Sequence, residues 1–173
     1  MLGFLPPVVK GSLAACLLAM NTVVLAQFLM AVSLLRFLVP LAGFQRRCTA
    51  AAVWIAELWI AINSQWMRLT QRMQWEVDGI EQLDKEQWYL VTSNHQSWAD
   101  IFILQHLLNR KIPMLKFFLK QELIWVPVIG LGWWALDFPF MKRYSKEYLE
   151  KHPEKRGQDF ESTRRACEKF EHL

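Results

Sequence analysis

One stretch near the start of the chain constrains the fold more than any other, because Gly11–Leu35 carries no charged residue over about 25 positions. About 20 apolar residues in a helix suffice to cross the hydrocarbon core of a bilayer. Lys10 precedes the stretch, whereas Arg36, Arg46 and Arg47 follow it. Because positive charge concentrates on the cytoplasmic side of a span, we expect a single N-terminal membrane helix with the remaining chain in the cytoplasm.

A cleaved signal peptide is the alternative interpretation of the same stretch. Such peptides have a shorter apolar region and end at a small-x-small cleavage site. Here the apolar run is longer and continues through LLRFLVPLAGF without a convincing site of that kind. We therefore favour a membrane anchor that covers residues 1–48.

Residues 49–73 predict a second helix, which is amphipathic. Glu57, Ser64, Arg68 and Gln71 lie on its polar face. The apolar side chains recur at steps of three and four residues: Trp54, Leu58, Ile62, Trp66, Leu69 and Met73. The uninterrupted apolar part is too short to span a bilayer. The apolar face is expected either to lie in the membrane interface or to pack on the protein's own core.

The overall composition favours a lipid surface over nucleic acid as the partner of this chain. The sequence is 53% hydrophobic, contains nine Trp and seven Met, and carries a net charge of +4. Basic charge beside so much apolar surface suits anionic lipid headgroups, and no nucleic-acid-binding motif is present. Three widely spaced cysteines form neither a metal-binding pattern nor a disulfide framework.

Beyond residue 73, predicted strands alternate with predicted helices, which is typical of an α/β domain. Strands are expected near residues 74–77, 88–92, 114–118 and 136–140. Helices are expected near residues 98–109, from residue 121 with a break around Pro127 and Gly130, and over residues 158–171. The domain organisation is therefore an anchor (1–48), an interfacial helix (49–73) and an α/β domain (74–173).

A histidine stands in the gap between a predicted strand and a predicted helix. Ser97 and Asp100 fit the Ser-x-x-Asp pattern of a helix N-cap, so the helix should begin at Trp98. His95 in the incoming loop can then fold back over the first turn. Asp100 would accept a hydrogen bond from one ring N–H and fix the tautomer, which leaves the other nitrogen as a base.

Two structural interpretations of these residues remain open. Asp100 completes a capping box and favours the helix dipole without any catalytic role. A single loop histidine is usually solvated or structural, and His106, further along the same helix, is expected to be a surface or packing residue. No third ligand stands at a familiar spacing from His95, so we expect no metal.

The segment Asn94–Asp100 resembles the first block, N-H-x-S-x-x-D, of the glycerophospholipid acyltransferases. It is most similar to that of the 1-acylglycerol-3-phosphate acyltransferases of the bacterial inner membrane. The segment WEVDGIEQL resembles the family's strand and turn before this block. The segment LKFFLKQELIWVPVIGLGWWALDFPFMKR resembles the family's second block, so the resemblance covers residues 73–143.

The resemblance implies an acyl transfer that needs no cofactor. His95 would take the proton of the free hydroxyl of a lysophospholipid, chiefly lysophosphatidic acid, and Asp100 would orient His95. The hydroxyl would attack the thioester of acyl-CoA or acyl-carrier protein at the inner (plasma) membrane. Asn94 and Ser97 would support the pair.

Basic residues of the second block would bind the acceptor, by the same resemblance. Arg143, with Lys142, would hold the phosphate group, for which a guanidinium fork is well suited. Lys120 falls where the family often carries a basic residue. The alternative for the MKR segment is an ordinary basic edge on a protein that faces a membrane.

The family's third block, Glu-Gly-Thr-Arg, does not occur in this sequence. This predicts that residues 74–173 are the N-terminal part of an acyltransferase domain that is incomplete at its C-terminus. The rival hypothesis is a catalytically silent, truncated, membrane-associated interaction module of the same fold.

Overall fold

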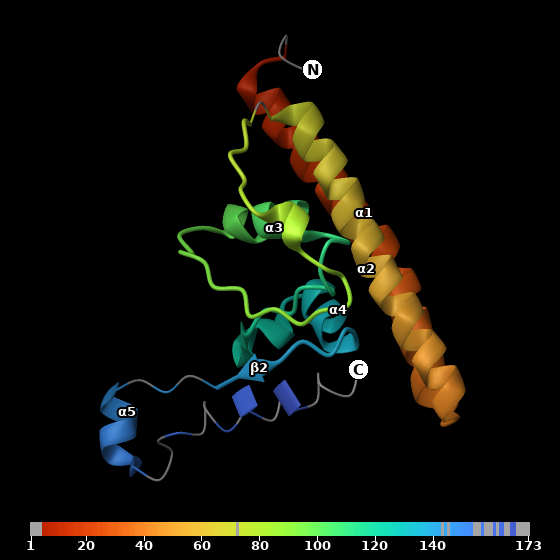
Figure 1. Cartoon of the computed structure of the whole chain (residues 1–173), viewed down its shortest axis with the longest axis vertical. Coiled ribbons are helices and arrows are strands. Elements are labelled where there is room, and N and C mark those ends of the chain that lie inside the picture. Colours follow the sequence, from red (N-terminus) through yellow and green to blue (C-terminus); the bar gives the residue numbers. More distant parts are fainter. Residues whose placement is uncertain are drawn as a thin grey trace. The chain divides into compact units, whose positions relative to one another are not determined.

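The computed structural model describes residues 5–71, 73–142, 144, 146–153, 157, 161, 163, 164, 167 and 168. The chain divides into two compact units, of which the first ends at Leu115 and the second begins at Lys116. Figure 1 shows that helices dominate the first unit.

A hairpin of two long helices forms the larger part of the first unit. Helix α1 runs over Pro7–Leu38 and helix α2 over Ala42–Thr70, and Figure 1 shows them side by side. The break between them lies at Pro40, because the residue before a proline is disfavoured in the helical conformation. Val39 is accordingly extended, with φ −113° and ψ 98°.

Polar groups inside the hairpin fix how α1 and α2 pair. Asn21 is buried, and its Nδ2 donates to the carbonyl oxygen of Trp59 at 3.1 Å and to Asn63 Oδ1 at 2.7 Å. Trp59 Nε1 donates to Thr22 Oγ1 at 3.0 Å. Buried polar groups need such partners, so these bonds favour one register of the two helices.

Within the described residues, α1 is the one helix that is long and apolar enough to cross a membrane. Only 11% of its most apolar stretch is buried inside the protein, which is unlike a core helix of a soluble domain. Membrane spans and signal sequences share this composition.

Helix α2 differs from its prediction in two respects. It begins at Ala42 rather than at residue 49, so the two helices follow each other almost directly. Glu57, which was predicted on the polar face of this helix, is buried, because its side chain is only 8% exposed. Packing within the first unit decides which face of α2 is buried. That face includes Glu57, whereas Trp54, which was predicted on the apolar face, is 56% exposed.

Helix α3 (Trp98–Leu108) completes the first unit and packs on α2. The rings of Phe102 and Trp59 lie 6.1 Å apart, and Asn109 Nδ2 donates to the carbonyl oxygen of Glu57 at 3.2 Å. Before α3, a left-handed turn at Gly79 (φ 75°) leads into the short 3-10 helix η1 (Ile80–Gln82).

The strands predicted at residues 74–77 and 88–92 are wrong, since both segments lack regular secondary structure. An extended segment becomes a strand only when a neighbour satisfies its backbone groups. No other described segment pairs with either of them, and Leu90 is 86% exposed.

The second unit contains two short parallel strands, β1 (Leu119–Lys120) and β2 (Phe140–Met141). The 3-10 helix η2 (Gln121–Trp125) and helix α4 (Ile129–Ala135) lie between them in sequence, and helix α5 (Lys146–Lys151) follows. Both strands begin later than expected, so the predictions at 114–118 and 136–140 are displaced. With so few strand residues in the described part of the chain, the α/β class stays a prediction.

A glycine allows α4 to lie against η2. A Cβ atom on Gly130 would overlap the carbonyl oxygen of Ile124 and would lie 2.8 Å from that of Leu123. The break predicted near Pro127 and Gly130 is present, between η2 and α4. Of the helix predicted over residues 158–171, the structure describes positions 161, 163, 164, 167 and 168, which are helical. Helix α5 was not predicted.

Candidate active site

The first turn of α3 is closed by a reciprocal cap. Ser97 Oγ accepts the backbone N–H of Ala99 at 3.2 Å. Asp100 Oδ2 in turn accepts the backbone N–H of Ser97 at 2.7 Å and that of Gln96 at 2.6 Å. The expected cap at Ser97 is therefore present, and α3 begins at Trp98. This capping box involves residues within only four consecutive positions, from Ser97 to Asp100.

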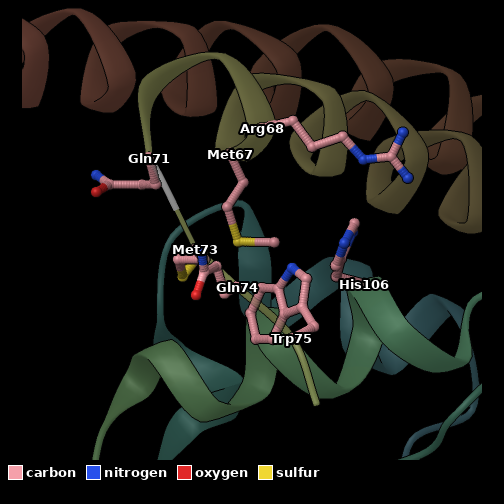
Figure 2. Close-up of a pocket in the computed structure, with 7 residues that line it drawn as sticks. All are labelled: Met67, Arg68, Gln71, Met73, Gln74, Trp75 and His106. Carbon is pink, nitrogen blue, oxygen red and sulfur yellow. The ribbon is translucent and has the colours of Figure 1, made fainter. Parts of the chain in front are cut away.

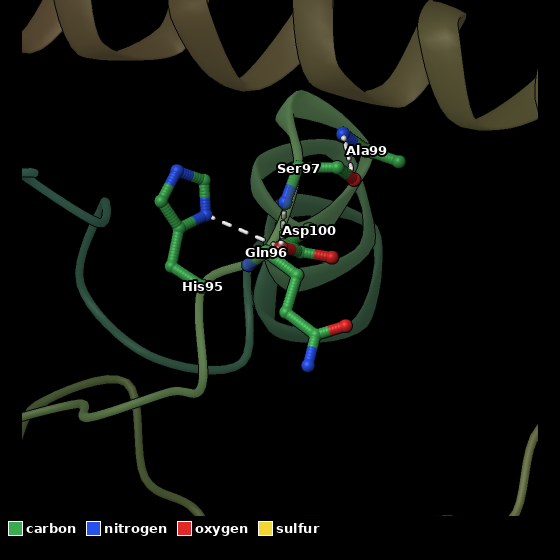
Figure 3. Close-up of polar contacts among 5 residues, drawn as sticks. All are labelled: His95, Gln96, Ser97, Ala99 and Asp100. Carbon is green, nitrogen blue, oxygen red and sulfur yellow. Dashed lines mark hydrogen bonds and ion pairs between the residues drawn. The ribbon is translucent and has the colours of Figure 1, made fainter.

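The structure brings His95 and Asp100 together. His95 Nδ1 lies 3.2 Å from Asp100 Oδ2, the same oxygen that accepts the two backbone N–H groups. Figure 3 shows the second ring nitrogen of His95 on the side away from Asp100. The His95 side chain is 58% exposed, whereas that of Asp100 is 26% exposed. The outer nitrogen is therefore accessible to a molecule arriving from outside.

The carboxylate of Asp100 is stabilised in its ionised form. The backbone hydrogen bonds from Ser97 and then Gln96 lower the pKa of Asp100, and His95 lowers this pKa further. Hydrogen bonds to a charged form favour that form. An anionic Asp100 is a hydrogen-bond acceptor only, so a neutral His95 facing it carries its proton on Nδ1. Nε2 then has a free lone pair and can accept a proton.

The predicted acceptor-binding residues belong to the second unit. Lys120 ends β1, where it pairs with Met141, and Lys142 follows directly after β2. Both lysines are exposed. Arg143 lies outside the described residues. Asn94 is exposed in the loop before His95, with no hydrogen bond to another described residue.

An ion-pair cluster that was not predicted ties α2 to two other segments of the first unit. Glu57 Oε1 lies 3.4 Å from Lys85 Nζ, and Glu57 Oε2 lies 3.4 Å from Arg110 Nε. Its one sequence signal is the isolated acid in AAVWIAELWIAI. An acid among apolar residues needs a partner when the helix is buried.

Metal-binding geometry is not found in the part of the chain that the structure describes. There, no group of three or more His, Cys, Asp or Glu side chains comes close enough to hold an ion.

Comparison with known proteins places this site inside a family match. A family model described as Acyltransferase matches residues 74–167, which is more than half of the 173-residue chain. The matched segment contains the His95–Asp100 pair. No curated protein and no solved structure matches the chain.

Proposed function

This chain belongs to the acyltransferase family, and from that premise we propose that it is a membrane-bound enzyme that acylates a lysophospholipid. The donor is acyl-CoA or acyl-carrier protein, and the acceptor is lysophosphatidic acid, which becomes phosphatidic acid. One observation carries the proposal: within the family match, an exposed imidazole is held by an ionised carboxylate at the start of a helix.

In the proposed mechanism, His95 acts as the general base. Its Nε2 takes the proton of the acceptor hydroxyl while the hydroxyl oxygen attacks the thioester carbonyl carbon. The tetrahedral intermediate collapses with cleavage of the C–S bond, and the thiolate leaves with the proton that His95 held. Asp100 keeps the ring in position and stabilises the imidazolium. Because a thioester is already activated, no acyl-enzyme is required.

Basic side chains of the second unit provide the proposed phosphate site. Lys142 and Arg143 follow β2, and Lys120 ends the paired strand β1. A guanidinium binds a phosphate with two parallel N–H donors, whereas lysine acts as a point charge. We assign the main role to Arg143, with Lys142 and Lys120 as contributors.

The apolar helix α1 supports the membrane assignment. Its length and composition suit a span, and the positive residues that follow it suit the cytoplasmic side. In this arrangement the catalytic residues work at the cytoplasmic leaflet of the inner membrane, where an acceptor with one acyl chain is embedded.

An acyl-transfer assay tests this function. Membranes that contain the chain are given a labelled acyl thioester and lysophosphatidic acid, and the labelled product is measured. We expect labelled phosphatidic acid from the unchanged chain and a loss of about 10²–10⁴-fold in His95→Ala. His152→Ala, a change of an exposed histidine outside the motif, should retain the original rate. Arg143→Gln should raise the apparent KM for lysophosphatidic acid but not for the uncharged 1-acylglycerol.

Two results would contradict the proposal. Equal rates for the unchanged chain and His95→Ala would exclude His95 as the base. Absence of transfer from the unchanged chain with either donor would favour the catalytically silent interaction module.

A further inference from the structure

The two segments that flank the His95–Asp100 pair meet at one buried acid of α2. The side chain of Glu57 is 8% exposed. Its Oε1 lies 3.4 Å from the Nζ of Lys85, which stands ten positions before His95. Its Oε2 lies 3.4 Å from the Nε of Arg110, which stands ten positions after Asp100. These three residues, the Glu57 cluster, therefore hold both ends of the segment that carries the proposed base.

The rear end of this segment is attached to α2 at two points. Asn109 follows the last residue of α3, and its Nδ2 donates to the carbonyl oxygen of Glu57 at 3.2 Å. Arg110 comes next, in the left-handed conformation with φ 63°. This conformation is unfavourable for a residue with a side chain, and it persists where surrounding contacts hold it. The ion pair with Glu57 is such a contact, so it fixes Arg110 on α2.

The front end of the segment is a compact turn around Lys85. Asp84 Oδ1 accepts the backbone N–H of Glu86 at 2.9 Å, which closes the turn. The backbone N–H of Asp84 donates to Tyr89 Oη at 2.8 Å, so the turn is also joined to the chain that leads toward the base. The ion pair between Lys85 and Glu57 attaches this turn to α2.

The chain between these two attachments contains an exposed loop. Residues 88–96 form no helix or strand, and residues 90–99 are all exposed. Packing therefore contributes little to the path of the loop, which depends on where its ends are held. Fixing the ends of a loop reduces the number of conformations that it can adopt. His95 lies in this loop with its side chain 58% exposed, so the position of its ring depends on those attachments.

The burial of a charge at this place favours a role in positioning. A buried ion pair adds little net stability compared with apolar side chains of similar size, but it can select one arrangement of the segments that it joins. A displacement of about 1 Å at a reacting group, caused by a distant change, can slow a reaction by about 10²-fold. The Glu57 cluster is placed to prevent such a displacement of His95.

We propose that Glu57 is a positioning residue, which holds the His95 ring on Asp100 by fixing the two ends of the segment between Lys85 and Arg110. Glu57 acts through His95 and touches no reacting group. Its effect on turnover rests on the proposed function, whereas its effect on the ring can be measured without turnover.

NMR of the imidazole nitrogens tests the position of the ring. The full-length chain is labelled in its histidines and studied in zwitterionic nanodiscs at about pH 8, above the ordinary histidine pKa near 6.5. His95→Gln identifies the His95 signals. We expect the proton on Nδ1 in the unchanged chain, facing Asp100, and a mixture of both tautomers in Glu57→Gln. Glu86→Gln removes an exposed acid of the same segment and should leave the signals unchanged.

Two NMR results would overturn the proposal, whether or not the chain transfers acyl groups. One is retention of the Nδ1–H tautomer in Glu57→Gln. The other is a mixture of tautomers already in the unchanged chain.

Acyl-transfer rates separate positioning from a loss of folded protein. Glu57→Gln should lower kcat about tenfold with unchanged KM values, and should leave the residual rate of His95→Ala unchanged. A merely structural role would lower both rates by the same factor, which would overturn the proposal.

Single changes at the two ends keep the test open if Glu57→Gln fails to fold. Lys85→Gln and Arg110→Gln each release one end and should each lower kcat about threefold, whereas Arg110→Lys, which keeps the charge, should retain most of the turnover. Unchanged kcat in both Gln variants would overturn the proposal. Absence of transfer from the unchanged chain would contradict the proposed function instead, and the tautomer of His95 would then decide the role of Glu57.

Discussion

Asp100 holds the His95 ring with the same oxygen that closes the first turn of α3. Asp100 Oδ2 lies 3.2 Å from His95 Nδ1 and accepts the backbone N–H groups of Gln96 and Ser97. Helix capping and imidazole orientation are therefore coupled through one atom. A rigid helix start fixes the carboxylate, and the carboxylate fixes the ring of an otherwise exposed loop residue.

The two roles of Asp100 can be separated with Ser97. Ser97→Ala removes the bond to the Ala99 N–H and should lower stability by about 1 kcal/mol while retaining most of the turnover. Asp100→Asn should lower turnover by about 10²-fold or more, because the amide does not select the required tautomer. Thermal unfolding and acyl-transfer rates measure the two effects. An equal loss of turnover in Ser97→Ala and Asp100→Asn would show that Asp100 acts only as a capping residue.

Glu57 is expected to contribute more to stability than an ordinary surface ion pair. Glu57→Gln should destabilise the chain by about 1–3 kcal/mol, because it removes the charge that pairs with Lys85 and Arg110. The loss is limited to this range because both basic side chains are half-exposed and water can solvate them. The double change Lys85→Gln/Arg110→Gln should cost more, about 3–5 kcal/mol, because it leaves a buried carboxylate without a charged partner. Denaturant unfolding in detergent measures the free energy of unfolding of Glu57→Gln and of the double variant. A smaller loss in the double variant than in Glu57→Gln would contradict this account.

Gly130 is expected to tolerate no side chain. Gly130→Ala should destabilise the second unit by about 1–3 kcal/mol, since the added Cβ collides with the backbone of Ile124. Gly43→Ala is the matched control, because a Cβ there meets nothing within 4 Å. In helix α2 it should be neutral or stabilising by up to about 1 kcal/mol. Equal effects of both changes on the unfolding midpoint would disprove the close packing.

Stability should depend on pH through His106. Burial, followed by the charges of Arg68 and Lys111, lowers the pKa of His106 in the folded chain. As the pH falls, His106 therefore binds a proton at a higher pH in the unfolded chain than in the folded chain. The contribution of His106 to stability is complete above the ordinary histidine pKa near 6.5, and it declines as the pH falls toward the lowered pKa of the folded chain.

His106→Gln should flatten this decline between pH 7 and pH 5. Gln71→Ala, a change of a non-titrating residue that lines the same pocket as His106, should leave the decline unchanged. Unfolding midpoints measured across this pH range provide the comparison. A decline as steep in His106→Gln as in the unchanged chain would assign the pH dependence to other groups.

Local chemistry made parts of this fold predictable. The start of α3 followed from Ser97 and Asp100, which satisfy backbone groups only a few positions away. The uncharged run Gly11–Leu35 predicted α1, and Pro40 accounts for its end. These features depend on neighbours in sequence, so a pattern is sufficient to find them.

Long-range partners account for the parts that the sequence did not predict. Glu57 is buried because Lys85 and Arg110, from distant segments, converge on it. The segment 88–92 has the composition of a strand, but an extended chain needs a paired neighbour, which the described residues do not provide. A pocket lined by Met67, Trp75 and His106 likewise combines α2, the segment after it and α3 (Figure 2).

A double-mutant cycle on acyl transfer tests the central claim most directly, with rates measured for His95→Ala, Asp100→Asn and the combined variant. If Asp100 acts by orienting His95, the combined variant should be no slower than His95→Ala alone, because the two residues work as one unit. Losses that multiply in the combined variant, or an unchanged rate in His95→Ala, would contradict the account.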